Sequence, residues 1–80
     1  MNAKLVEARK KAGFTQGRLS AKVGVNRSTY AHYERGRAPS LEIALRIARE
    51  LGVSVEDVFA LNVLNKHNDQ SNIFAFLPVS

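Results

Sequence analysis

Apolar residues recur through the first sixty residues of the chain at helical spacing. The strongest pattern lies in residues 41–51, LEIALRIAREL, where apolar positions follow i, i+3, i+4, i+7 and i+10. It predicts a helix that Ser40 caps and Gly52 ends. The predicted buried stripe is Leu41, Ala44, Leu45, Ala48 and Leu51, widened by Ile43 and Ile47.

Two further helices are predicted near the ends of this region. A weaker stripe through Leu5, Ala8 and Ala12 predicts a helix over residues 2–12, which Asn2 can cap. Ser54, followed three residues later by an aspartate, predicts the start of a short helix. We expect the apolar residues of that last helix to close the core.

Residues 15–37, TQGRLSAKVGVNRSTYAHYERGR, predict two short helices joined by a tight turn. The first covers residues 16–23 behind a Thr15 cap, and Gly24 supplies the turn. The second opens at Asn26 and ends at Gly36, with Tyr30 among its inward residues. Such a pair, with positive charge around the second helix, is what a DNA-reading helix-turn-helix requires.

The remainder of the chain changes in character after residue 64. Residues 65–72, NKHNDQSN, are polar and predict a linker. Residues 73–79, IFAFLPV, are apolar and β-prone, and we expect this run to be covered on its own domain or in a dimer. The alternative is a disordered tail. The predicted organisation is therefore one DNA-binding domain at 1–64 and a linker with an apolar, β-like tail at 65–80.

Charge adds a candidate ligand class. The chain carries a net charge of +5, but residues 1–37 hold nine basic and two acidic side chains, whereas residues 38–64 hold two basic and four acidic ones. A basic half beside a mildly acidic half indicates a polyanion-binding face. A solvated basic surface is the alternative that charge alone leaves open.

Several functional classes find no support in the composition. The chain has no cysteine, only two histidines far apart, and no glycine-rich phosphate loop, so we expect no enzyme activity, metal or cofactor. No apolar run approaches the roughly 20 residues that span a membrane, and the N-terminus has no signal-peptide core. We therefore expect a cytoplasmic protein that does not act at a membrane.

Four ordered segments together resemble a known family. They are T-Q-x-x-L from Thr15, KVGVNRST from Lys22, YERGR from Tyr33 and PSLEIALRIARELGVSVEDVF from Pro39. These segments are similar to the Cro and lambda-repressor-like (XRE-type) helix-turn-helix family of bacterial and phage regulators, over roughly residues 2–60. The resemblance implies an all-α, compact five-helix domain, binding to double-stranded DNA, and usually a homodimer on a palindromic operator.

The resemblance also assigns candidate site residues. The positions that match base-reading residues are Arg27, Ser28 and His32, with Asn26 as a further candidate. The candidate phosphate contacts are Gln16, Arg18, Arg35 and Arg37. Arg27 can bond guanine or a phosphate, Ser28 can bond either, and His32 can touch a base edge, a phosphate or neither. The family often pairs an arginine of the first helix with a late glutamate of the third, which implies an ion pair between Arg9 and Glu34.

Two residues depart from the family pattern. Gly17 stands where a helix-favouring residue is usual and costs the helix about 1 kcal/mol relative to alanine. It either lets a phosphate approach or simply weakens the helix. Ser20 stands where an alanine usually packs, and we expect its hydroxyl to bond back to the helix.

The sequence thus predicts a sequence-specific regulator of transcription, expected to be a repressor, that reads the major groove of DNA as a homodimer. We place its dimer interface in the fifth helix and the apolar tail. The alternative is an antitoxin or other interaction module on the same fold, whose residues 73–77 bind a second protein.

Overall fold

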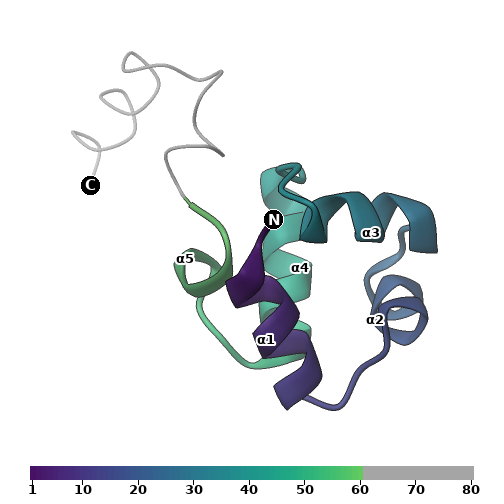
Figure 1. Cartoon of the computed structure of the whole chain (residues 1–80), viewed down its shortest axis with the longest axis horizontal. Coiled ribbons are helices and arrows are strands. Elements are labelled where there is room, and N and C mark those ends of the chain that lie inside the picture. Colours follow the sequence, from purple (N-terminus) through teal and green to yellow (C-terminus); the bar gives the residue numbers. More distant parts are fainter. Residues whose placement is uncertain (61–80) are drawn as a thin grey trace.

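A computed structural model describes residues 1–60, which contain five α-helices and no strand (Figure 1). The helices are α1 (Ala3–Lys11), α2 (Gln16–Val23), α3 (Arg27–Glu34), α4 (Leu41–Leu51) and α5 (Val55–Val58). The all-α, five-helix prediction is confirmed. The predicted linker and apolar tail, with the partner segment at residues 73–77, lie outside the described residues. Within residues 1–60, no helix has the length and apolar character to cross a membrane.

Each of the first four helices begins at a side-chain cap. The side-chain oxygens of Asn2, Thr15, Asn26 and Ser40 accept hydrogen bonds from backbone N–H groups in the first turn of the helix that follows. The backbone N–H of Ser54 donates to Asp57 Oδ2 at the start of α5. These bonds satisfy donors that have no partner within the helix. Because the caps are local, the sequence placed the helix starts well.

The core lies where all five helices meet. Its largest fully buried side chains are those of Tyr30, Leu5, Leu19, Ile47 and Val23. Phe14 and Val25 pack against this cluster from the loops that flank α2. The inner sides of α2 and α3 are therefore used to hold the helix pair, which leaves their outer sides free to carry polar groups.

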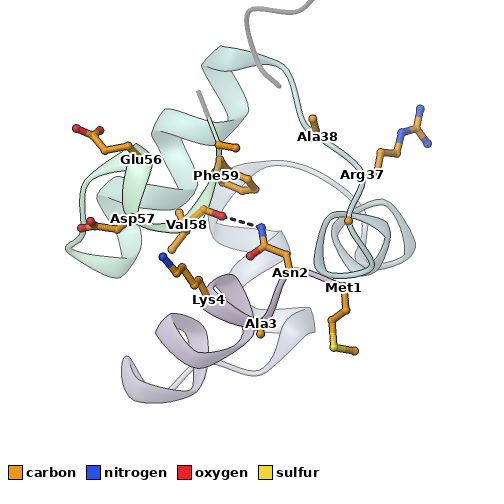
Figure 2. Close-up of a pocket in the computed structure, with 12 residues that line it drawn as sticks. Met1, Asn2, Ala3, Lys4, Arg37, Ala38, Glu56, Asp57, Val58 and Phe59 are labelled. Carbon is orange, nitrogen blue, oxygen red and sulfur yellow. Dashed lines mark hydrogen bonds between the residues drawn. The ribbon is translucent and has the colours of Figure 1, made fainter. Parts of the chain in front are cut away.

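The N-terminus ties α1 to two other parts of the fold. The backbone N–H of Asn2 donates to Glu34 O at the end of α3, over 2.8 Å. Figure 2 shows its side-chain amide Nδ2 donating to Val58 O in α5, over 2.6 Å. Residues at the end of α3 and in α5 are thus linked through one residue, beside a pocket that the N-terminus, the loop after α3 and α5 line.

The predicted buried stripe of α4 is wrong at two positions. Leu41 and Leu45 are 50% and 43% exposed. The buried positions are instead Ala44, Ile47, Ala48 and Leu51, with Ile43 half-buried. Successive residues advance by about 100° around a helix, so the apolar arc of α4 is too wide to be buried completely. Packing against α2 and α5 selects the isoleucine side.

Helix α1 also differs from its predicted stripe. Leu5 is buried and Ala8 is half-buried, as the spacing predicted, but Ala12 is exposed. The buried position between them belongs to Arg9. A charged residue there requires a partner, and that partner lies in α3.

Candidate nucleic-acid interface

The outer face of α3 is polar and open. Arg27, Ser28 and His32 are exposed at the first position, the second position and one turn later. Arg35 caps the C-terminal end of the helix, and Arg37 follows in the loop to α4; both are exposed. The structure therefore gathers five of the eight candidate DNA contacts along one helix and its exit.

The start of α3 is organised by Asn26. Its Oδ1 accepts a hydrogen bond from the backbone N–H of Thr29 over 2.8 Å and another from the hydroxyl of Ser28 over 3.0 Å. The side-chain oxygen Oδ1 of Asn26 is thus used by the cap. Its side-chain nitrogen Nδ2 is the group that can still donate a hydrogen bond to DNA. With its proton directed at Asn26, the Ser28 hydroxyl is arranged to accept from a ligand.

The N-terminus of α2 carries Gln16 and Arg18. Arg18 is exposed, and its backbone N–H donates to the Thr15 hydroxyl that caps the helix. Gln16 is half-buried, and its Nε2 donates to Glu34 Oε1 over 2.9 Å. The sequence predicted a phosphate contact for Gln16 but not this bond. The amide has a second N–H, so the bond to Glu34 orients Gln16 while leaving a donor for a phosphate.

Below these residues, Glu34 is the centre of a buried hydrogen-bond network. Arg9 Nε lies 2.6 Å from Glu34 Oε2 and its Nη2 lies 3.3 Å from Oε1, so the ion pair is bidentate. The Tyr30 hydroxyl donates to Oε2 over 2.7 Å. Arg9 Nη1 also donates to Phe14 O. Helices α1, α2 and α3 are joined through this one carboxylate.

The network sets the protonation of its members. Burial opposes ionisation of Glu34, but the hydrogen bonds from Arg9, Gln16 and Tyr30 outweigh it and hold the pKa of Glu34 below its ordinary value. The hydrogen bond to Glu34 raises the pKa of Arg9, against the effect of burial. Burial, together with the bond to Glu34, raises the pKa of Tyr30. The ion pair is therefore charged and the tyrosine neutral near pH 7.

Gly17 has a neighbour that the sequence did not predict. A Cβ built on Gly17 would lie 3.7 Å from Cδ of Arg27, at ordinary van der Waals distance. The aliphatic stem of Arg27 thus passes close to α2. The hydroxyl of Ser20 donates to Gly17 O over 2.9 Å, which confirms the predicted bond back to the helix.

Sequence reasoning missed Arg46 as a support of the turn. Its Nη1 lies 3.4 Å from Val23 O at the C-terminal end of α2, and its Nη2 donates to Glu42 Oε2 over 2.8 Å. A cation at a helix C-terminus interacts favourably with the free carbonyl groups and the helix dipole. The i, i+4 spacing of Glu42 and Arg46 could have revealed their pairing. The contact of Arg46 with α2 could not be predicted from this spacing.

Comparison with known proteins gives the same picture of the chain. A family model described as helix-turn-helix matches residues 5–58. An uncharacterized HTH-type transcriptional regulator of Methanothermobacter thermautotrophicus is 47% identical over 64 residues, which cover 78% of this chain and 93% of that protein. A Bacillus subtilis protein described in the same way, YgzD, is 41% identical over 66 residues, which cover 81% of this chain and all of that protein. No solved structure matches the chain.

Proposed function

Because the chain belongs to the helix-turn-helix family of DNA-binding regulators, we propose that it reads a specific sequence in the major groove of double-stranded DNA and represses transcription there. It does so as a homodimer on a palindromic operator. The two-fold symmetry of such a site repeats one short reading helix on each half. The helix-turn-helix match and the relatives described as HTH-type transcriptional regulators support a DNA-binding role.

The observation that carries this proposal is the division of α3 into two sides. Tyr30, Tyr33 and Glu34 are buried and fix the helix. Arg27, Ser28 and His32 are exposed on its outer side. A helix held rigidly from behind, with hydrogen-bonding side chains in front, can present those side chains to base edges in the major groove.

Affinity and specificity come from different groups in this proposal. Gln16, Arg18, Arg35 and Arg37 contact phosphates at the two ends of the helix pair, which sets the position of α3 and supplies salt-dependent affinity. The arginine at the start of α3 is suited to a bidentate contact with guanine O6 and N7. The amide of Asn26, the hydroxyl of Ser28 and the imidazole of His32 add finer discrimination.

Selection of bound sequences from a random pool of double-stranded DNA tests the proposal directly. We expect a motif made of two inverted half-sites, with centres about 34 Å apart along the helix axis, which is one turn of B-DNA. A reporter gene carrying that motif across its promoter should be expressed less when the protein is present. Recovery of no shared motif would refute sequence-specific reading, and increased expression would refute repression.

A further inference from the structure

Helix α4 has an exposed side that joins apolar and charged residues. Among residues 1–60, the exposed large apolar side chains are those of Met1, Leu41 and Leu45. The two leucines stand one helical turn apart on α4. They share a shallow hollow with Glu42, Arg46 and Arg49. We call these five residues the α4 outer face. Isolated exposed leucines are common on proteins, but here the two form one patch along a helix.

Charge on the α4 outer face is ordered along the helix. Glu42 lies near its N-terminal end and Arg49 lies two turns later. If two copies of α4 pack antiparallel about a two-fold axis near Leu45, residue 42 of one copy comes opposite residue 49 of the other. Leu45 then meets Leu45 of the second copy. Glu42 also bonds Arg46 of its own helix over 2.8 Å, so each Glu42 would lie between Arg46 of its own copy and Arg49 of the other. The leucines meet at the centre, and the face fits itself in this way, which is the requirement for a two-fold interface.

The position of α4 suits a dimer that reads DNA. Figure 1 shows α4 beginning where the chain leaves α3. Arg46, on one edge of the outer face, contacts the carbonyl of Val23 at the helix turn. A second copy bound to this face would lie directly beside the helix-turn-helix unit.

We propose that the α4 outer face, in place of the fifth helix and apolar tail that the sequence predicted, is the surface through which two copies of this chain associate. The proposal rests on the proposed function for its biological role, since a palindromic operator requires a dimer, but the surface itself can be tested without DNA. An 11-residue helix is only about 16 Å long, so its face covers less than the roughly 800 Å² per partner of stable dimers. The dimer is therefore weak in free solution and strengthened when both copies bind one DNA.

Cysteine cross-linking provides the direct test, because the natural chain has no cysteine and each introduced thiol is unique. Under mild oxidation, Leu45→Cys should form a disulfide-linked dimer at least about tenfold faster than Glu56→Cys. The control residue Glu56 is an exposed position of α5. Both rates are normalised to the reaction of each thiol with a small reagent. Equal rates, or faster linking through residue 56, would overturn the proposal.

A charge exchange tests the orientation of the two copies. Glu42→Arg should weaken dimerisation in sedimentation experiments, because it sets two arginines against each other. The double variant Glu42→Arg/Arg49→Glu should restore it. Circular dichroism checks that each variant folds, as expected for exposed positions. Unchanged dimerisation in both variants would contradict this interface.

DNA binding separates failure of the interface from failure of the proposed function. On the selected palindrome, Leu45→Glu should bind roughly thirtyfold more weakly, since two partly exposed leucines lose their burial in the dimer. Its affinity for a single half-site should stay unchanged. Loss of half-site binding would show that Leu45 serves the monomer and would overturn the proposal. Absence of any specific binding by the unaltered chain would refute the function and leave the cross-linking result as the test of the surface.

Discussion

At the scale of single residues, the arrangement of Arg27 is the most informative for function. It is exposed at the first position of α3, and its stem passes close to Gly17 in α2. The sequence identified the residue type and its position on the helix. It left open whether the guanidinium reads a base or grips a phosphate, because that choice depends on the docking geometry of the helix on DNA.

Replacement of Arg27 by alanine distinguishes these two roles. We expect Arg27→Ala to weaken binding to the selected operator by about 1–3 kcal/mol and to relax the preference at one base pair in each half-site. Random DNA should be bound with much less change. The measurement is a pair of titrations on specific and random duplexes, with Arg35→Ala as the phosphate-contact comparison. An equal loss on both duplexes would identify Arg27 as a phosphate contact only.

Gly17 offers a prediction about stability. A Cβ at this position has room, and among the described glycines this one is helical rather than left-handed. Gly17→Ala should therefore raise the free energy of unfolding by about 1 kcal/mol, as measured by urea denaturation. Gly24 is the matched control: with φ at +84°, its replacement by alanine should destabilise the fold. A destabilised Gly17→Ala would mean that Arg27 cannot accommodate the added methyl group.

At the scale of helices, the sequence predicted the first residue of each helix far better than which side of the helix is buried. Caps such as Thr15 and Ser40 are bonded within four residues, so their signal is local. The rotation of α4 depends on its contacts with α2 and α5. Spacing alone therefore placed Leu41 and Leu45 on the buried side, where the structure exposes them. The same dependence on neighbours hid the bond between Gln16 and Glu34.

The junction of α1, α2 and α3 makes a further prediction. Glu34→Gln keeps an acceptor oxygen but leaves the guanidinium of Arg9 buried without a counter-charge. Removing one partner of a buried ion pair costs about 3–5 kcal/mol, and we expect a loss of that order at pH 7 by urea denaturation. The control is Glu42→Gln, whose exposed pair with Arg46 should contribute less than about 1 kcal/mol.

Comparison of the natural chain with Glu34→Gln also predicts how stability depends on pH. The folded pKa of Glu34 lies below its ordinary value of 4.5. Its stabilisation is therefore fully present above pH 4.5 and is lost as pH falls through the folded pKa. The stability difference between the natural chain and Glu34→Gln should shrink across that acidic window. A difference that stays constant or grows on acidification would show that Glu34 is not held ionised by its partners.

At the scale of the whole molecule, the division of charge along the sequence predicts a polyanion-binding half, but the basic residues of that half lie on more than one side of the fold. Lys10 and Lys11 belong to the basic half of the sequence, yet they lie at the C-terminal end of α1 and border a pocket with α4 and α5. Arg9, in the same turn, reaches α3 through Glu34, whereas Lys10 and Lys11 line the pocket on another side of the helix. A net charge counted along a sequence includes residues on every side of a fold. Only the folded arrangement tells which of them can meet one phosphate backbone.

Salt dependence turns this distinction into a measurement. The logarithm of the DNA-binding constant falls with the logarithm of salt concentration in proportion to the number of phosphates that the protein neutralises. Arg37→Ala should lower the affinity for all sequences and reduce this slope by about one per protomer. Lys11→Ala also removes one positive charge, at the C-terminal end of α1. This variant should leave the slope unchanged. If both variants reduced the slope equally, general electrostatic attraction would account for the effect; if neither did, Arg37 would lie outside the interface with DNA.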